Sequence, residues 1–316
     1  MAKILLIGEP MALLIAETVG PLETVENFTR KLAGAEVNVC IGLTRLGHTA
    51  TYVTRLGRDP FGLYTLNHLK QEHISTDFIT FDDEYLTGMM LKGKVETGDP
   101  HIAYYRKGSA ASKMTPEQMD MIDLTGFDLI HMTGILPALS KTCLAATVRL
   151  MQCAKEKGIT VSFDPNLRPT LWESKEEMTT TINNLAKLSD IILPGVGEGL
   201  LLMGSDDPAE IADFYQDLGA KQVIVKLGAK GAYVRDQDIS VTIPGFKVEK
   251  VVDTVGAGDG FATGIISGIV EGLSLVDATR RANAIGSIQI QHIGDNEGLP
   301  TRETLESYMK QTQTSD

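Results

Sequence analysis

The chain has 316 residues, of which 29 are lysine or arginine and 41 are aspartate or glutamate, so its formal net charge is −12. This acidic balance, without any cluster of basic residues, argues against nucleic acid or an anionic membrane as a partner. The three cysteines, Cys40, Cys143 and Cys153, lack metal-ligand spacing, and their odd number argues against a disulfide framework.

The apolar segments of the chain are short. The first of them, residues 4–7, is followed at once by Gly8-Glu9-Pro10, too soon for a signal peptide. Every other apolar run falls well below the roughly 18 residues of a membrane-spanning helix. The length allows one large domain or two small ones. We expect a cytoplasmic protein with a single domain over residues 1–316.

Short apolar segments alternate with amphipathic helical patterns along the chain. Strands are predicted at residues 4–7, 51–54, 129–132, 160–163, 191–193 and 223–226. Helical patterns between them include residues 36–46, 144–157 and 211–218. Strands that alternate with helices predict an α/β fold, with a mainly parallel sheet covered by helices on both faces.

Two segments without a helical pattern interrupt this alternation, residues 11–31 and 85–106. Each has the pattern of strands around a turn, at Val19-Gly20-Pro21 in the first segment and at Thr97-Gly98-Asp99-Pro100 in the second. The pattern alone is compatible with two surface hairpins on the main domain or with a separate small sheet.

A glycine-rich segment at residues 252–261, Val-Asp-Thr-Val-Gly-Ala-Gly-Asp-Gly-Phe, separates a predicted strand from a predicted helix. The strand is predicted from the apolar positions at Phe246, Val248, Val251 and Val252, and the helix from the apolar run at residues 261–270. Glycines at positions 256, 258 and 260 allow backbone conformations and close approaches that a Cβ would block.

The chemistry of this segment depends on Asp259. If a helix follows, the backbone N–H groups of Ala257, Gly258 and Asp259 lie at its positive end, which binds phosphate and other anions. A carboxylate there would repel phosphate, unless it removes a proton from a hydroxyl that attacks the phosphate. The alternative is an ordinary turn in which Asp259 is only an acidic cap. The preceding Asp253-Thr254, with the flanking strand and helix, favours the catalytic interpretation.

The segment Asp-Thr-Val-Gly-Ala-Gly-Asp at residues 253–259 resembles the C-terminal signature of the ribokinase (PfkB) family of sugar kinases, and further segments match between residues 8 and 300. The resemblance implies a ribokinase-like α/β fold in which residues 11–31 and 85–106 form a small β-sheet lid. It also implies ATP and Mg²⁺ as cofactors, with Asp259 as the catalytic base. The loop formed by Gly256, Ala257 and Gly258 would stabilise the transferred phosphoryl group.

The same resemblance extends to an acceptor site. Residues 33–38, Ala-Gly-Ala-Glu-Val-Asn, resemble the N-terminal signature of the family, which implies that Gly34 and Asn38 contact the sugar. Taken alone, Asn38 is a typical polar residue near a helix start. Residues 104–110, Tyr-Tyr-Arg-Lys-Gly-Ser-Ala, are similar to the 2-keto-3-deoxygluconate kinases of the family, which implies acceptor contacts from Tyr104 and Arg106. Without the family, this run is an ordinary strand end.

A third arginine-containing segment, Asp-Pro-Asn-Leu-Arg at residues 164–168, follows a predicted buried strand. The guanidinium of Arg168 offers a fork of donors suited to a carboxylate or a phosphate, or it forms a salt bridge with Asp164. The resemblance implies that Arg168 holds the carboxylate of the acceptor. Met90 occupies the position of a substrate-contacting tyrosine in some of these kinases.

The nucleotide and metal residues also follow from the resemblance. Glu198 corresponds to the glutamate of a family motif tied to Mg²⁺ and its waters, while Gly195 replaces the asparagine of that motif. Mg²⁺ keeps most of its waters, so this departure is compatible with a kinase. Residues 226–232 form a glycine-rich turn, which a hairpin alone would explain. The resemblance implies that Lys226, Gly228 and Gly231 of this turn, together with Asn283, lie beside ATP. Asp253 and Gly294 correspond to a monovalent cation site, which suggests K⁺.

The signatures of P-loop NTPases, protein kinases and Rossmann oxidoreductases are absent from the sequence. We therefore predict an ATP-dependent kinase that phosphorylates the terminal hydroxyl of a small sugar or sugar acid, first of all 2-keto-3-deoxygluconate to its 6-phosphate. A fructokinase or ribokinase-type kinase of a neutral sugar is the nearest alternative. A non-catalytic sugar-binding regulator on the same fold is the alternative from another class. A homo-oligomer formed through the lid is also expected.

Overall fold

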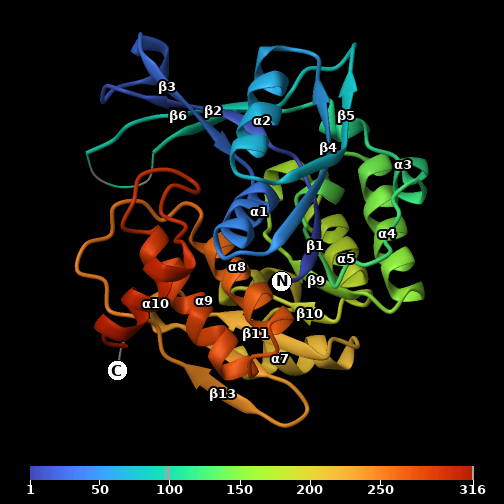
Figure 1. The fold of residues 1–316 in the computed structure, drawn as a ribbon, viewed down its shortest axis with the longest axis vertical. Coiled ribbons are helices and arrows are strands. Elements are labelled where there is room, and N and C mark those ends of the chain that lie inside the picture. The colour runs from blue at the N-terminus through green and yellow to red at the C-terminus, as the bar shows by residue number, and fades with distance from the viewer. Residues whose placement is uncertain (97, 99, 315–316) are drawn as a thin grey trace.

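The computed structural model describes residues 1–96, 98 and 100–314, and these residues form two β-sheets of unequal size with helices packed around the larger one (Figure 1). In the described chain the large sheet has nine strands in the order β13-β12-β11-β10-β9-β8-β1-β4-β5. Its strands are β1 (Lys3–Ile7), β4 (Thr49–Gly57), β5 (Ser75–Asp82), β8 (Leu129–Thr133), β9 (Thr160–Asp164), β10 (Ile191–Ile192), β11 (Gln222–Lys226), β12 (Ala232–Arg235) and β13 (Ser240–Ile243).

The large sheet is parallel from β5 to β11, and only β12 and β13 run antiparallel to their neighbours. The helices are α1 (Ala35–Arg45), α2 (Pro60–Gln71), α3 (Pro116–Asp120), α4 (Lys141–Glu156), α5 (Lys175–Ala186), α6 (Val196–Leu202), α7 (Pro208–Asp217), α8 (Ala257–Val270), α9 (Leu275–Gln289) and α10 (Arg302–Gln311). The six strands predicted to alternate with helices are all present, and the expected mainly parallel α/β fold is confirmed. The two edge strands, β5 and β13, were not predicted.

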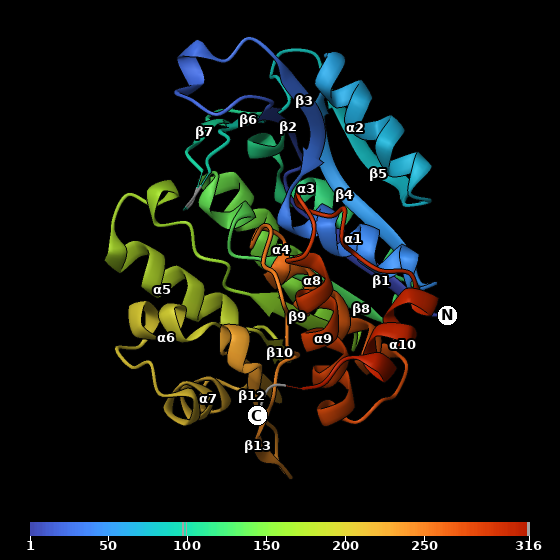
Figure 2. The same ribbon diagram turned by 90° about the vertical axis from the view of Figure 1, so that its left-hand side faces the viewer.

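The core consists of two apolar layers on opposite faces of the large sheet. Along β1, Ile4 and Leu6 pack in the layer that contains α1, α8 and α9, whereas Leu5 and Ile7 pack in the layer that contains α4, α5 and α7. Figure 2 shows α1, α8, α9 and α10 on one side of the sheet and α4 to α7 on the other. A strand that is buried on both faces needs continuous apolar residues, which explains the Ile-Leu-Leu-Ile run of β1. No helix in the described residues has the length and apolar character that a membrane crossing requires.

A separate four-stranded sheet covers one end of the large sheet. In the described chain its order is β3-β2-β6-β7, with β2 (Met11–Ala16), β3 (Phe28–Ala33), β6 (Met89–Lys92) and β7 (Ile102–Tyr105). The two segments that lack a helical pattern in the sequence therefore pair with each other, through parallel contacts between β2 and β6, rather than forming isolated hairpins. The turn predicted at residues 97–100 includes Thr97 and Asp99, which lie outside the described residues.

One predicted strand is wrong. The residues before the glycine-rich segment form a loop rather than a strand, except for an isolated bridge between Phe246 and Thr314. The backbone N–H groups of Val252 and Asp253 both donate to the carbonyl oxygen of Ile290, at the C-terminal end of α9. Val251 and Val252 are also exposed, so the apolar spacing does not correspond to a half-buried strand.

Small residues bring α8 and α9 into close contact. A Cβ added to Gly264 would lie 2.3 Å from the Cα of Ala282, and one added to Gly268 would lie 2.5 Å from the Cβ of Ala278. This packing fixes the direction of α8, whose first turn carries Asp259.

Because of this contact, Gly264→Ala is expected to lower the free energy of unfolding by about 1–3 kcal/mol through overpacking. At an exposed helix position the same substitution would instead stabilise the helix by about 1 kcal/mol. The matched control is Gly197→Ala in α6, where an added Cβ meets no atom within 4 Å. Urea denaturation measures both variants. Equal effects of the two substitutions would contradict the close contact between α8 and α9.

Candidate active site

Most of the predicted site residues gather in a cavity at the carboxyl ends of the parallel strands. The cavity has a volume of about 550 Å³ and lies where β9 and β11 end, beside the first turn of α8 and the second sheet. Open α/β sheets bind their ligands at this edge. The predicted residues that line it are Gly34, Asn38, Met90, Tyr104, Arg106, Arg168, Glu198, Lys226, Gly256, Gly258 and Asp259. The predicted residues not found in this lining are Gly228, Gly231, Asp253, Ala257, Asn283 and Gly294.

Helix α8 begins at Ala257, four residues earlier than the apolar run suggested. Gly256 precedes it with a φ of 78°, and a Cβ at this position would lie 2.0 Å from the carbonyl oxygen of Asp295, so only glycine fits. Ala257, Gly258 and Asp259 are therefore the first three residues of the helix. Their N–H groups have no carbonyl four residues earlier within the helix, although that of Ala257 donates to the carbonyl oxygen of Thr254 at 3.4 Å. N–H groups at such a helix end are suited to bind an anion.

Asp259 projects from this first turn toward the cavity, and a neutral amide contacts its carboxylate. Asn38 Nδ2 donates to Asp259 Oδ2 at 2.7 Å, while Asn38 Oδ1 accepts from Asn296 Nδ2 at 2.9 Å. Burial raises the pKa of Asp259 to about 6; the hydrogen bond from Asn38 and the charges of Arg168 and Lys226 act in the opposite direction. Asn38 thus orients Asp259, a role that the sequence did not reveal, and its expected sugar contact stays a prediction.

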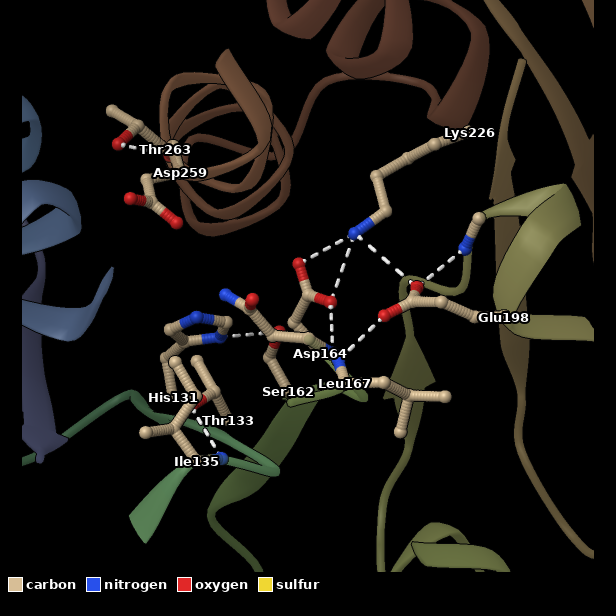
Figure 3. A network of polar contacts seen from close by, with 12 residues as sticks. His131, Thr133, Ile135, Ser162, Asp164, Leu167, Glu198, Lys226, Asp259 and Thr263 are labelled. Carbon is tan, nitrogen blue, oxygen red and sulfur yellow. Dashed lines mark hydrogen bonds and ion pairs between the residues drawn. The ribbon is translucent and has the colours of Figure 1, made fainter. Parts of the chain in front are cut away.

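A second group of charges faces Asp259 across the cavity (Figure 3). Lys226 Nζ lies 2.8 Å and 2.7 Å from the two carboxylate oxygens of Asp164 and 3.9 Å from Glu198 Oε2. Glu198 in turn accepts hydrogen bonds from the N–H groups of Gly195, at 2.7 Å, and Leu167, at 2.8 Å. Lys226 therefore compensates the negative charges of two side chains, Asp164 at the end of β9 and Glu198 in the first turn of α6.

Arg168 lies in the same lining but does not form the expected alternative salt bridge. Within the described chain Asp164 pairs with Lys226. Arg168 Nη1 instead donates to the carbonyl oxygen of the preceding residue, Leu167, at 3.0 Å. A guanidinium has five N–H donors, so Arg168 keeps donors for a ligand.

Arg106 is tied to a residue that the sequence analysis did not select. Its Nε donates to Glu9 Oε2 at 2.6 Å, its Nη2 also contacts this carboxylate oxygen, and Ser109 donates to the other oxygen. Arg106 and Glu9 are both buried. Tyr104 is exposed at the cavity, and the centre of its ring lies 5.8 Å from the guanidinium carbon of Arg106. In the pairing of β6 with β7, Tyr104 lies opposite the buried Met90.

Two buried glutamates of the site were missed. Glu9 lies two residues after the end of β1, so its position at the carboxyl end of a parallel strand was a usable signal. Glu36 in the first turn of α1 accepts a hydrogen bond from Thr133, and burial raises its pKa to about 7. A charged residue in the first turn of a helix is normally solvated, so the local sequence did not mark Glu36.

The predicted nucleotide residues beyond Lys226 have structural roles of their own. Gly231 has a φ of 94°, and a Cβ there would lie 2.1 Å from the carbonyl oxygen of Ile243. Asn283 is buried and donates from Nδ2 to the carbonyl oxygens of Ile243 and Pro244, at 3.2 Å and 3.0 Å. Gly228 has a φ of 61° at the turn between β11 and β12. Contacts of these residues with ATP stay predictions.

The acidic groups at the cavity fit a hydrated Mg²⁺. In the described residues no cluster of three or more acidic, histidine or cysteine side chains forms an all-protein metal cage. Mg²⁺ usually takes one or two carboxylates together with substrate phosphates and waters. Glu198 and Asp164 line the same cavity as the first turn of α8, and oxygen donors of this kind suit the ion.

Comparisons with known proteins identify the family of this chain. The model of the pfkB family carbohydrate kinases matches residues 1–302. The 2-dehydro-3-deoxygluconokinase of Bacillus subtilis is 46% identical over 310 residues, 97% of this chain and 95% of that protein.

Solved structures share the fold along the whole chain. A PfkB protein from a Polaromonas species has a TM-score of 0.89 at 44% identity, and the match covers 97% of this chain and 100% of that one. An Escherichia coli protein described as a ribokinase II, solved with ATP and Mg²⁺, has a TM-score of 0.87 at 25% identity, with 98% and 99% covered. The predicted family is confirmed: the chain belongs to the PfkB family of carbohydrate kinases.

Proposed function

We propose that the chain transfers the γ-phosphoryl group of ATP to the terminal hydroxyl of 2-keto-3-deoxygluconate, which is also called 2-dehydro-3-deoxygluconate. The observation that carries the proposal is the position of Asp259, a carboxylate in the first turn of α8 that shares one cavity with Arg168 and Lys226. The name of the Bacillus subtilis relative supports the choice of acceptor.

Asp259 acts as the general base of this reaction. A pKa of about 6 keeps its carboxylate ionised at neutral pH, while it remains more basic than an ordinary aspartate. It accepts the proton of the attacking hydroxyl, and Asn38 holds its Oδ2 in place. The N–H groups of Ala257 and Gly258 stabilise the negative charge of the transferred phosphoryl group, because phosphoryl transfer is catalysed mainly by positioning and electrostatics.

Glu198 and Asp164 would hold Mg²⁺ through its waters, and the ion would supply charge neutralisation on the phosphates of ATP. Lys226 Nζ, which lies between these two carboxylates, would contact the same phosphates. We place the nucleoside of ATP beside the turn between β11 and β12, which contains Gly228 and Gly231, and beside Asn283. K⁺ at Asp253 and Gly294 is a separate expectation, taken up below.

The carboxylate of the acceptor binds Arg168. Glu9 engages Nε and Nη2 of Arg106, which lines the same cavity, and its expected contact with the acceptor stays a prediction. The second sheet contributes Met90, Ile102 and Tyr104 to the cavity and would close over the acceptor as a lid. A homo-oligomer formed through this sheet stays a prediction.

The alternatives are a kinase of a neutral sugar and a regulator without turnover. A neutral sugar would leave the free donors of Arg168 without an anionic partner. A regulator would not need Asp259 in a position to receive a proton. Both alternatives are distinguished from the proposal by the three variants below.

Asp259→Asn is expected to lower kcat by about 10²–10⁴-fold, the usual contribution of a general base. ATP binding should persist, and stability above pH 7 should not fall, because the substitution replaces a carboxylate whose raised pKa shows that its ionised form is disfavoured. Steady-state kinetics, ATP titration calorimetry and thermal unfolding test this. A folded variant with near-normal kcat would refute the assigned base.

Asn38→Ala is expected to move the acidic limb of kcat/KM to higher pH. The hydrogen bond from Asn38 lowers the pKa of Asp259, so its loss raises that pKa above about 6, and less of the base is ionised near neutrality. Profiles between about pH 5 and pH 9 compare the variant with the wild type. A uniform loss of activity with an unmoved limb would mean that Asn38 contributes packing but does not tune Asp259.

Arg168→Ala is expected to raise KM for 2-keto-3-deoxygluconate by about 10- to 100-fold, because a charge-assisted hydrogen bond contributes roughly 1.5–3 kcal/mol. Arg168→Lys should recover only part, since the bidentate fork is lost. The KM for fructose, measured in parallel, should change little. Equal weakening of both acceptors would show that Arg168 does not recognise the carboxylate.

A further inference from the structure

A buried lysine of the second sheet contacts the glycine-rich segment. Lys92 is the last residue of β6, and its side chain is only 5% exposed. Its Nζ lies 2.6 Å from Oδ2 of Asp253, whose side chain is 12% exposed. Lysine is almost never this buried without a partner of opposite charge. The pair joins residues that are 161 positions apart in the sequence.

The carboxylate of Asp253 also accepts hydrogen bonds from two loops. Its Oδ1 accepts from the N–H of Val255 at 3.1 Å, the residue before Gly256. Its Oδ2 accepts, besides Lys92, the N–H of Gly294 at 3.3 Å. The carboxylate thereby ties the start of the phosphoryl-transfer loop to the loop at Gly294. Lys92 ties both loops to the second sheet.

The surroundings of Asp253 carry an excess of negative charge. Asp295, which follows Gly294, is buried, and its Oδ1 has no hydrogen-bond partner within the described residues. Burial raises the pKa of Asp295 to about 7, the charge of Lys92 acts in the opposite direction, and the charges of Asp259 and Asp253 raise it further. A positive charge at this place therefore stabilises the acidic groups beside the transfer loop.

The K⁺ expected from the sequence does not fit this arrangement. Both oxygens of the Asp253 carboxylate already have partners, Oδ1 the N–H of Val255 and Oδ2 Lys92 and the N–H of Gly294, so a cation bound by this carboxylate would compete with Lys92. The ammonium also supplies the single positive charge that K⁺ would bring. K⁺ could bind here only if Lys92 moved away.

We propose that the Lys92 ammonium takes the place of a monovalent cation, so that the enzyme needs no K⁺ and its transfer loop is held by the second sheet itself. The proposal rests on the proposed kinase function where activity is measured. Lys92 is a positioning residue, because it acts on the backbone N–H of Val255 through Asp253. A site built this way also couples the placement of the second sheet to the geometry of the transfer loop.

The test is Lys92→Met, which keeps the apolar stem and removes the ammonium. In a tetramethylammonium buffer the variant should lose about 10- to 100-fold in kcat, as expected for a lost charge-assisted contact. Added K⁺ or NH₄⁺ should restore much of this loss with saturation. The matched control is Lys94→Met, since Lys94 is exposed and donates to the carbonyl oxygen of Glu17. The wild type and this control should be indifferent to K⁺.

A second readout needs no acceptor. K⁺ that binds only the folded Lys92→Met protein should raise its thermal unfolding temperature, whereas the wild type and Lys94→Met should show no such shift. This result stands even if no acceptor is phosphorylated, so it separates failure of the inference from failure of the proposed function.

Activation of the wild type by K⁺ would overturn the inference. So would a Lys92→Met protein that loses activity and regains neither activity nor stability with K⁺ or NH₄⁺. If Lys92→Met does not fold, Lys92→Arg decides: it keeps the charge and should remain active and indifferent to K⁺. A Lys92→Arg enzyme that requires K⁺ would contradict the proposal.

Discussion

The structure of the site depends on basic side chains that neutralise the negative charges of its acidic residues at the carboxyl edge of the large sheet. Glu9 pairs with Arg106, Asp164 with Lys226, and Asp253 with Lys92. Removing one partner of a buried pair typically costs about 3–5 kcal/mol, because the other charge remains buried without compensation. Each pair is therefore a strong constraint on the two elements that supply it.

Asp259 differs from these paired carboxylates, because its direct partner is the neutral amide of Asn38. Arg168 and Lys226 affect it only as nearby charges. Burial consequently raises its pKa to about 6, whereas a direct ion pair would favour the ionised form and make it a weaker base. Because the other acidic residues form ion pairs and Asp259 does not, Asp259 is the proton acceptor beside the N-terminal end of α8, which is suited to bind an anion. This division also lets a protein of net charge −12 receive the phosphates of ATP.

Much of the fold and the location of the site could be predicted, because both depend on local patterns. The apolar runs marked the central strands, and the glycine spacing around Gly256 reflects a backbone conformation that only glycine adopts there. The pairings could not be predicted. Arg106 with Glu9, Lys92 with Asp253 and Asn38 with Asp259 join residues that are 97, 161 and 221 positions apart. The loop before Asp253 was mistaken for a strand, because its backbone bonds are made to Ile290 rather than to another strand.

The most direct test of the account is the reaction of the wild-type enzyme with ATP and Mg²⁺ on a panel of acceptors, with ADP release measured and the product identified by ³¹P NMR. The account predicts that 2-keto-3-deoxygluconate has the highest kcat/KM of the panel and that the new phosphate ester lies on its terminal carbon. A higher kcat/KM for fructose or ribose, or a phosphate on another hydroxyl, would contradict it.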